Sequence, residues 1–192
     1  MVNTPSTMLK LGTPAPDFKL TDAVSGEQTS LQDFRTKVLV VMFICNHCPF
    51  VIHVRGGITQ LAREFAEKDV AFVAINANDL EKYPQDGPEH MKELAEEMGW
   101  TFPFLFDDTQ EVAKAYRAAC TPDFFIFDAK RRLAYRGQLD DSRPSKDTPV
   151  TGKDVRAAIH ALLADKPVNP KQTASIGCNI KWRPGNEPDY FR

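Results

Sequence analysis

The segment that most constrains the fold is an apolar run over residues 37–44 that leads directly into Cys45 and Cys48. A run of this length is typical of a buried strand and is far shorter than the ~20 apolar residues of a membrane span. Pro49 follows, and an apolar stripe with spacings of three and four residues predicts an amphipathic helix through Val51, Val54, Ile58, Leu61 and Phe65. The sequence therefore predicts a strand-to-helix junction that carries both thiols.

Strand patterns and helix patterns alternate along the rest of the chain, which predicts an α/β fold built on a layered sheet. Thr151 and Asp154 are spaced like a capping box before the last helix. A polar loop is expected over residues 84–88. The further strands are expected at residues 70–75, 124–127 and 133–135, and the further helices at residues 89–98 and 152–164.

The length of 192 residues predicts one domain, residues 1–166, and a C-terminal tail, residues 167–192. The tail has no clear periodicity. We expect it to pack on the domain, because its apolar and aromatic side chains would otherwise be exposed. These side chains belong to Cys178, Ile180, Trp182, Tyr190 and Phe191.

Composition and charge exclude several classes of protein. Lys and Arg number 24 and Asp and Glu number 26, and no basic block indicates nucleic acid as a partner. The apolar segments are too short for a membrane protein, and the N-terminus lacks the pattern of a signal peptide. We therefore expect a cytoplasmic protein, in a compartment where cysteines tend to be catalytic, metal-binding or simply buried.

The spacing of Cys45 and Cys48 suits reversible dithiol chemistry. This chemistry needs one accessible thiolate and a second thiol that resolves a mixed disulfide. Cys45 is expected to be the accessible attacking thiol, and Cys48, one turn into the helix, the buried resolving thiol. His47 lies between them and is expected to favour the Cys45 thiolate, so the pKa of Cys45 should lie below that of an ordinary thiol.

Other uses of the cysteines remain open. The pair could form half of a zinc site, but the sequence has no second C-x-x-C motif to complete it. A carrier of a soft metal such as Cu(I) is a further alternative. Cys120 and Cys178 are possible accessory thiols. Cys120 is more simply a small buried side chain, whereas Cys178 could fold back over the redox pair.

Three landmarks resemble a known family, the peroxiredoxin-like branch of the thioredoxin superfamily with its AhpC/TSA and TlpA-like redoxins. Residues 11–18 resemble the entry segment of these proteins. The apolar strand and the Cys45–Cys48 motif resemble their active-site unit. Thr121 and Pro122, followed by residues 135–137, resemble their cis-proline loop and the hairpin after it. The resemblance spans about residues 10–165, and the landmarks occur in the family's order.

The resemblance implies a thioredoxin fold, with a central mixed sheet flanked by helices, an N-terminal redoxin extension and a C-terminal tail. It implies a cis Pro122 beside the thiols, where the Thr121 backbone could pair with an extended substrate peptide. It also implies a thiol–disulfide oxidoreductase. Its substrate would be a protein or a small-molecule thiol or disulfide, and its electron donor a thiol. Neither a cofactor nor a metal is expected.

The chain departs from the family's peroxidases, whose motif P-x-x-x-T-x-x-C ends on the cysteine that attacks peroxide. Aligning that cysteine with Cys48 places Cys45 where the threonine would stand. This favours disulfide exchange. The alternative is a thiol peroxidase in which Cys48 is peroxidatic and Cys45 resolves. The strand before the cysteines has no acidic residue, and residues 51–53 have none either, so the sequence does not identify a carboxylate base.

Overall fold

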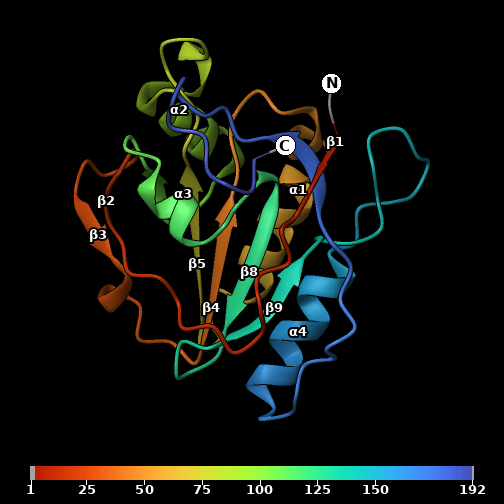
Figure 1. The fold of residues 1–192 in the computed structure, drawn as a ribbon. Helices are drawn as coiled ribbons and strands as arrows, with labels where there is room; N and C mark the ends of the chain where they lie inside the picture. The colour runs from red at the N-terminus through yellow and green to blue at the C-terminus, as the bar shows by residue number, and fades with distance from the viewer. Residues whose placement is uncertain (1–2, 192) are drawn as a thin grey trace.

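A seven-stranded mixed sheet forms the centre of the computed structural model, which describes residues 3–191 (Figure 1). The strand order is β3–β2–β6–β5–β4–β8–β9. Every residue of β4 is buried, as expected for the apolar run, and β4 lies parallel to β5 and antiparallel to β8. The bounds are β2 Lys19–Asp22, β3 Gln28–Ser30, β4 Val38–Phe43, β5 Val70–Asn76, β6 Phe104–Phe106, β8 Asp123–Phe127 and β9 Leu133–Gly137.

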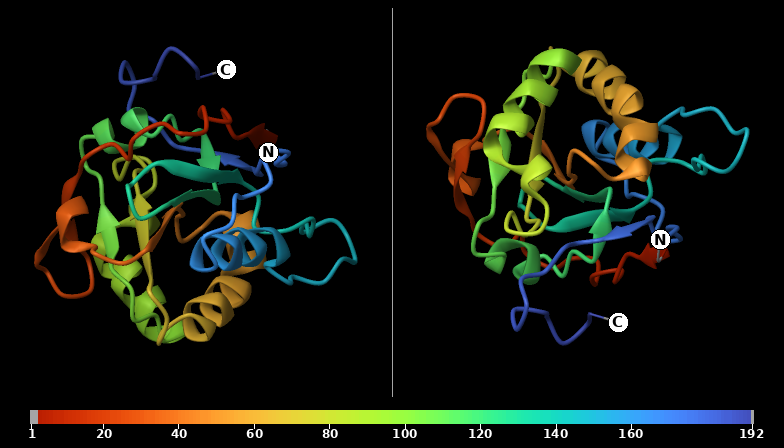
Figure 2. Two further views of the ribbon diagram at one scale, coloured as in Figure 1. Left: turned by 90° about the horizontal axis from the view of Figure 1, so that it is seen from below. Right: turned by 90° about the horizontal axis from the view of Figure 1, so that it is seen from above.

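Helices cover both faces of this sheet (Figure 2). Three of them, α1, α2 and α4, pack their apolar stripes on one face, while α3 and part of the C-terminal tail pack on the other. This arrangement confirms the expected central mixed sheet flanked by helices. None of the described helices is long and apolar enough to cross a membrane. The helices are α1 Pro49–Glu64, α2 Pro88–Met98, α3 Glu111–Ala115 and α4 Lys153–Leu163, with short 3-10 helices η1 Leu31–Asp33 and η2 Pro84–Asp86.

A second, three-stranded sheet joins the tail to the body of the protein. Its central strand, β10 (Ile176–Asn179), lies antiparallel to both β1 (Asn3–Pro5) and β7 (Cys120–Thr121). Beyond β10, Ile180 and Trp182 are buried in the core that contains α3. The division of the chain at residue 166 stays a prediction.

Two local expectations were wrong. Gly152, in the left-handed region at φ 65°, precedes α4, so Thr151 and Asp154 do not form a capping box. The first-turn amides of Asp154 and Val155 instead donate to the Leu139 carbonyl oxygen at 3.2 and 3.4 Å, while Asp140 Oδ2 accepts from the Thr151 and Gly152 amides just before the helix. The expected polar loop at residues 84–88 instead contains η2 and the first residue of α2.

Candidate active site

Both thiols lie in the connection between β4 and α1. Cys45 follows the strand by two residues, and Cys48 is the residue that precedes the first turn of α1. Pro49 occupies the first helical position, where its missing N–H is not needed. The exposed fraction is 1% for Cys45 and 0% for Cys48, so the expectation that Cys45 is accessible was wrong. Both cysteines are free.

The groups around Cys48 stabilise its thiolate. Hydrogen bonding from the Cys45 thiol lowers the pKa of Cys48 to about 5, against an ordinary value of 9.0, although burial opposes this shift. Thr121, Cys178 and the Val51 amide in the first turn of α1 contribute to the same lowering of the pKa. One contact favours the protonated form instead, because the Cys48 thiol can donate to the Thr121 carbonyl oxygen at 3.1 Å. The donors outnumber this acceptor, and the helix N-terminus adds to their effect.

Cys45 shows the opposite shift. Its hydrogen bond to the Cys48 sulfur, its burial and the negative charge of Asp86 raise the pKa of Cys45 well above 9.0. The Thr121 hydroxyl, whose oxygen lies 3.5 Å from Cys45 Sγ, acts in the other direction but does not outweigh them. The expectation that Cys45 titrates below an ordinary thiol was therefore wrong. These opposite shifts favour Cys48 over Cys45 as the thiol that ionises first.

The charge of the Cys48 thiolate should make the stability of the reduced protein depend on pH. The pKa of Cys48 is about 5 in the folded protein and 9.0 for an ordinary thiol, so between these values the unfolded chain binds more protons. The free energy of unfolding should therefore rise with pH over this interval, and the contribution should be lost as the pH falls through 5. Denaturant unfolding of the reduced and the oxidised protein at several pH values measures it, since the disulfide form carries no thiolate.

The ultraviolet absorbance of the thiolate gives an independent check. We expect a transition in the wild-type protein near pH 5 that is missing in Cys48→Ser. A single transition near the ordinary value of 9.0 would contradict the assignment of the charge to Cys48.

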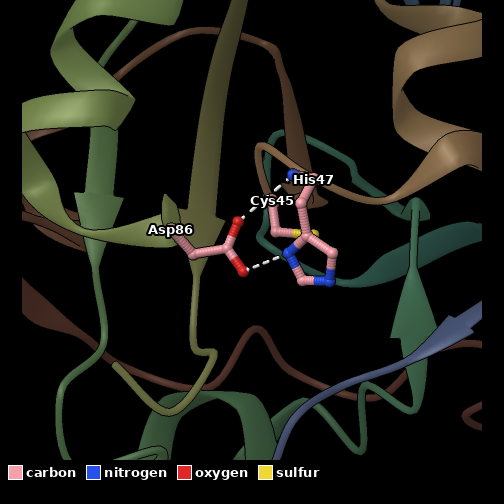
Figure 3. Close-up of side chains that lie close together, drawn as sticks. All are labelled: Cys45, His47 and Asp86. Carbon is pink, nitrogen blue, oxygen red and sulfur yellow. Dashed lines mark hydrogen bonds and ion pairs between the residues drawn. The ribbon is translucent and has the colours of Figure 1, made fainter. Parts of the chain in front are cut away.

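A buried carboxylate that sequence reasoning missed completes the site. Asp86, at the end of η2, has a fully buried side chain and lies 2.5 Å from Nδ1 of His47, measured from its Oδ2 (Figure 3). Burial opposes ionisation, but hydrogen bonds from His47 and Asn78 hold the pKa of Asp86 below its usual value. An ionised carboxylate only accepts hydrogen bonds, so Nδ1 of His47 carries a proton. The other ring nitrogen, Nε2, takes no part in this hydrogen bond and can accept a proton.

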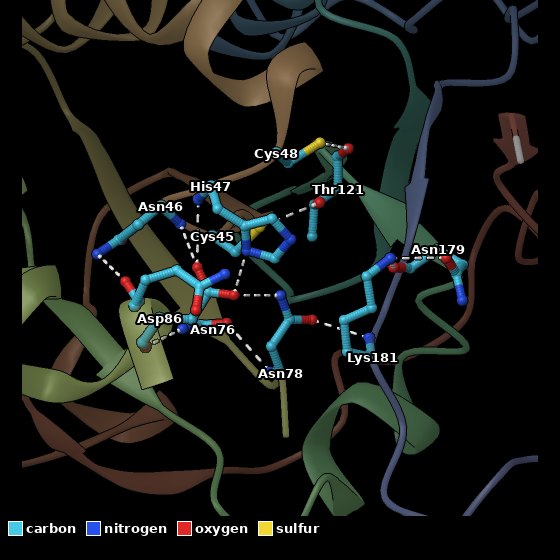
Figure 4. A network of polar contacts seen from close by, with 11 residues as sticks. Cys45, Asn46, His47, Cys48, Asn76, Asn78, Asp86, Thr121, Asn179 and Lys181 are labelled. Atoms are coloured by element: carbon cyan, nitrogen blue, oxygen red, sulfur yellow. Dashed lines mark hydrogen bonds and ion pairs between the residues drawn. The ribbon is translucent and has the colours of Figure 1, made fainter. Parts of the chain in front are cut away.

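Several further hydrogen bonds fix Asp86 in place (Figure 4). Its Oδ1 accepts from the backbone amides of Asn46 and His47, at 2.9 and 3.2 Å. Its Oδ2 accepts from the Asn78 side chain at 2.8 Å, and Asn78 in turn accepts from the backbone amide of Lys181 at 2.9 Å. The Asp86 carboxylate thus links the active-site turn to the segment after β5. Through Asn78, this link extends to the C-terminal tail.

The imidazole of His47 is also held from its face. The Tyr83 ring stacks on it with centroids 5.2 Å apart and an angle of 7° between the planes. The ammonium of Lys181 lies 5.7 Å from the centre of the Tyr83 ring. With Asp86 at its edge, the imidazole has a fixed orientation, and 26% of the His47 side chain is exposed to solvent.

Replacing Asp86 with asparagine should slow disulfide exchange on the order of 100-fold, as expected for a positioned acid–base group that loses its orientation. Asp86 acts through His47, so the same change in a His47→Ala background should cost little more. The rate of exchange against pH, measured for both backgrounds, tests this coupling. Asp107→Asn is the matched control, since Asp107 is a buried carboxylate that binds the Ala113 amide of α3. Equal losses in both backgrounds would indicate a purely structural role for Asp86.

Thr121 and Pro122 lie against the two thiols, and the peptide bond between them is cis, as the resemblance implied. Thr121 contacts Cys45 through its hydroxyl and Cys48 through its carbonyl. The expected role of Thr121 in pairing with a substrate peptide stays a prediction. In the described chain this strand edge already pairs with β10, with Cys178 opposite Thr121.

The two possible accessory thiols have different surroundings. Cys178 is buried in the same core cluster as Cys45 and Cys48, and hydrogen bonding from its thiol helps to lower the pKa of Cys48. The Cys120 thiol instead lies 3.7 Å from the carbonyl oxygen of Pro122, and burial holds its pKa well above 9.0. The structure thus places Cys178, and not Cys120, in the core cluster that contains the redox pair.

The residues of this site also include metal-ligand types. One ligand atom from each of Cys45, His47 and Asp86 lies within 4.8 Å of the other two. Thiolate, imidazole and carboxylate are the usual ligands of zinc. However, Nδ1 of His47 and Oδ2 of Asp86 are already joined to each other by a hydrogen bond. The expectation that the site works without a metal stays a prediction.

Comparisons with known proteins agree with this geometry. Residues 11–136 match the AhpC/TSA family. The chain belongs to the AhpC/TSA family. Thioredoxin-like protein YneN of Bacillus subtilis is 31% identical over 119 residues, which cover 62% of this chain and 66% of that protein. Thiol-disulfide oxidoreductase ResA of Geobacillus kaustophilus is 27% identical over 125 residues, or 65% and 67% of the two chains.

The chain thus spans about two thirds of the length of these curated relatives. The name of ResA is that of the enzyme class expected from the sequence, a thiol–disulfide oxidoreductase.

Solved structures confirm the fold. An uncharacterized conserved protein from Geobacillus kaustophilus is 56% identical, with a TM-score of 0.94 over 96% of this chain and 98% of that one. The thioredoxin domain of a thiol-disulfide oxidoreductase from Bacteroides vulgatus is 19% identical, with a TM-score of 0.60 over 77% and 96% of the two chains. The second likeness shows the fold alone, which is the thioredoxin fold expected from the sequence.

Proposed function

We propose that this AhpC/TSA-family protein catalyses thiol–disulfide exchange through the Cys45/Cys48 couple, with Cys48 carrying the thiolate. The observation that carries the proposal is a pair of buried thiols at the start of α1 that both contact Thr121, one of which has its pKa lowered to about 5. The thiolate is the attacking species in such reactions, and a second thiol in contact can resolve the mixed disulfide. This reverses the roles expected from the sequence, although the pair is the same.

The surrounding groups can perform each step of the exchange. The Cys48 thiolate attacks one sulfur of a substrate disulfide, and the other sulfur leaves as a thiolate that takes up a proton. Cys45 then attacks the Cys48 sulfur and releases the substrate as a thiol, which leaves a Cys45–Cys48 disulfide. His47 lies beside Cys45, held by Asp86, and is placed to take the proton that Cys45 loses. A thiol donor returns the couple to its reduced form.

The couple should be more oxidising than one built from ordinary thiols. A stabilised thiolate stabilises the reduced protein, which raises the reduction potential. We therefore expect a value above the about −270 mV of thioredoxin. Equilibration with glutathione buffers of known ratio measures it.

A peroxidase is the second candidate, with Cys48 peroxidatic and Cys45 resolving. Two observations favour it: the family match, and a thiolate on the cysteine that aligns with the peroxide-attacking position. The contact between the two thiols would let Cys45 resolve a Cys48 sulfenic acid. Against it, Cys45 stands where the peroxidase motif has threonine, which orients the peroxide.

Parallel assays separate the two candidates. The wild-type protein is tested for reduction of a disulfide substrate such as insulin and for consumption of hydrogen peroxide, each with dithiothreitol as donor. Disulfide reduction without comparable peroxide consumption supports the proposal. The reverse result would assign the protein to the peroxidases. Elemental analysis of protein purified without chelator tests the metal-carrier alternative, for which stoichiometric zinc or copper is the decisive result.

We also propose a cytoplasmic location, as expected from the sequence. The four free cysteines suit a reducing compartment. Fractionation of cells that produce the protein at its natural level tests this location.

A further inference from the structure

Cys178 lies on the strand that covers the redox pair. β10 places Cys178 directly opposite Thr121 in an antiparallel register. Opposite residues of such a pair point their side chains to the same face of the sheet, and neighbours along a strand alternate. Cys178 is therefore on the face of Thr121, whose hydroxyl and carbonyl contact the two active thiols. Cys120, one position before Thr121, is on the opposite face.

The contacts of the two thiols agree with this alternation. Cys178 is buried in the same core cluster as Cys45 and Cys48, and the exposed fraction of its residue is 6%. The Cys120 thiol faces Pro122, and hydrogen bonding with Ser6 and Ser175 acts on it from the same side. The core cluster around Cys48 thus contains two further thiols, Cys45 from its own turn and Cys178 from the tail.

We propose that Cys178 is a third redox thiol, which exchanges with the oxidised pair to form a Cys48–Cys178 disulfide. The proposal rests on the exchange activity proposed for Cys45 and Cys48. The Cys178 sulfur loses its proton and attacks the Cys48 sulfur of the Cys45–Cys48 disulfide. The new bond forms as the Cys45–Cys48 bond breaks, and Cys45 leaves as a thiolate that takes up a proton. Two electrons pass from Cys178 to Cys45, so no outside oxidant is needed.

The environment of each sulfur suits its part in this step. Cys45 is the leaving group and has the His47 imidazole beside it, which can supply the proton. In the reduced protein, burial and the neighbouring Cys48 thiolate raise the pKa of Cys178 to about 12, so Cys178 acts as a hydrogen-bond donor. Oxidation of Cys48 removes that negative charge, while the Lys181 ammonium, which favours the Cys178 thiolate, remains.

The disulfide would fasten the tail to the start of α1. β10 occupies the edge of Thr121, where the family resemblance places an extended substrate peptide. A Cys48–Cys178 bond would therefore hold this edge closed and keep Cys48 oxidised until a thiol donor reduces it. In this state the tail would occupy the position expected for a substrate peptide.

Peptide mapping tests the proposal directly. The protein is equilibrated with glutathione buffers, quenched with acid, alkylated and digested with trypsin without reduction. Cys45 and Cys48 fall in the peptide 38–55, Cys120 in 118–130 and Cys178 in 172–181. A link between 38–55 and 172–181 is expected in the wild-type protein. In Cys45→Ser, the Cys48 thiolate attacks oxidised glutathione and releases one glutathione thiol, and Cys178 then displaces the bound glutathione, so this link should increase at least tenfold.

Two variants serve as controls. Cys178→Ala should keep the Cys45–Cys48 disulfide and lose the link to 172–181, and Cys120→Ala should behave as the wild type. If the wild type and Cys45→Ser both lack the link while disulfide reduction persists, the proposal for Cys178 is overturned and the exchange function stands. If neither disulfide forms under oxidising buffers, both proposals fail. A wild-type link supports the proposal even where a variant does not fold.

Discussion

Cys48→Ser is expected to abolish disulfide exchange, whereas in Cys45→Ser the Cys48 thiolate should still attack a disulfide, and Cys178 should then displace the bound group to leave a Cys48–Cys178 disulfide. The reason is that the thiolate rests on Cys48, whose pKa is lowered to about 5, while burial and Asp86 keep Cys45 protonated. Only the thiolate attacks, and the remaining thiol is needed for release. The loss in Cys48→Ser should reach the uncatalysed rate. Insulin reduction and the intact mass after incubation with oxidised glutathione measure both effects.

The double variant Cys45→Ser, Cys178→Ala sharpens this result. With both neighbouring thiols removed, one glutathione should stay bound to Cys48, and the mass should increase accordingly. Cys120→Ala is the matched control, because it removes a buried thiol that does not contact Cys48 and should leave the rate unchanged. The opposite pattern, with glutathione trapped on Cys45 in Cys48→Ser, would return the attacking role to Cys45.

Gly177→Ala is expected to detach β10 from the redox pair. A Cβ atom at this position would lie 2.0 Å from the Thr121 carbonyl oxygen and 3.2 Å from the Pro122 nitrogen. These are backbone atoms held between the thiols and β8, so the added methyl group cannot be accommodated by a side-chain rotation. We expect the free energy of unfolding to fall by about 3 kcal/mol, as for severe overpacking. Cys48 should also react faster with alkylating reagents, because the strand that covers it moves.

Gly56→Ala provides the comparison for this variant. Gly56 lies inside α1, and a Cβ atom there would meet nothing within 4 Å. Alanine should therefore stabilise the helix by about 0.5–1 kcal/mol and leave the alkylation rate unchanged. Urea unfolding and timed alkylation with mass detection apply to both variants. Wild-type stability and a wild-type alkylation rate in Gly177→Ala would show that β10 is not held as tightly as the register implies.

The sequence was sufficient to predict the parts of the site that are local in the chain. The buried strand, the two cysteines and the start of α1 follow one another within residues 38–64, and their patterns are those of a strand and a helix. The cis proline was expected from its position before β8, through the family resemblance. Asp86 was missed because it lies 39 residues after His47 in a segment without periodicity.

A signal for Asp86 did exist in the topology. β4 and β5 are parallel neighbours, so their carboxyl ends meet at one edge of the sheet. The polar residues that follow β5 therefore approach the cysteines that follow β4. The order of the two thiol pKa values could not be found this way, since it depends on which donors surround each sulfur. The strand β10 was missed because its four residues contain a glycine and no alternation, and its place is set by pairing with a distant strand.

The tail supplies a built-in optical reporter. The chain has two tryptophans, and the structure places them in different cores. Trp182, four residues after Cys178, packs edge-to-face on Tyr190, whereas Trp100 stacks on Phe102 under α1 and α2. Release of β10 would carry Trp182 toward water and shift its fluorescence to longer wavelength, while Trp100 stays in place. In a Trp100→Phe background, the emission of one side chain would therefore follow the opening and closing of the redox centre in real time.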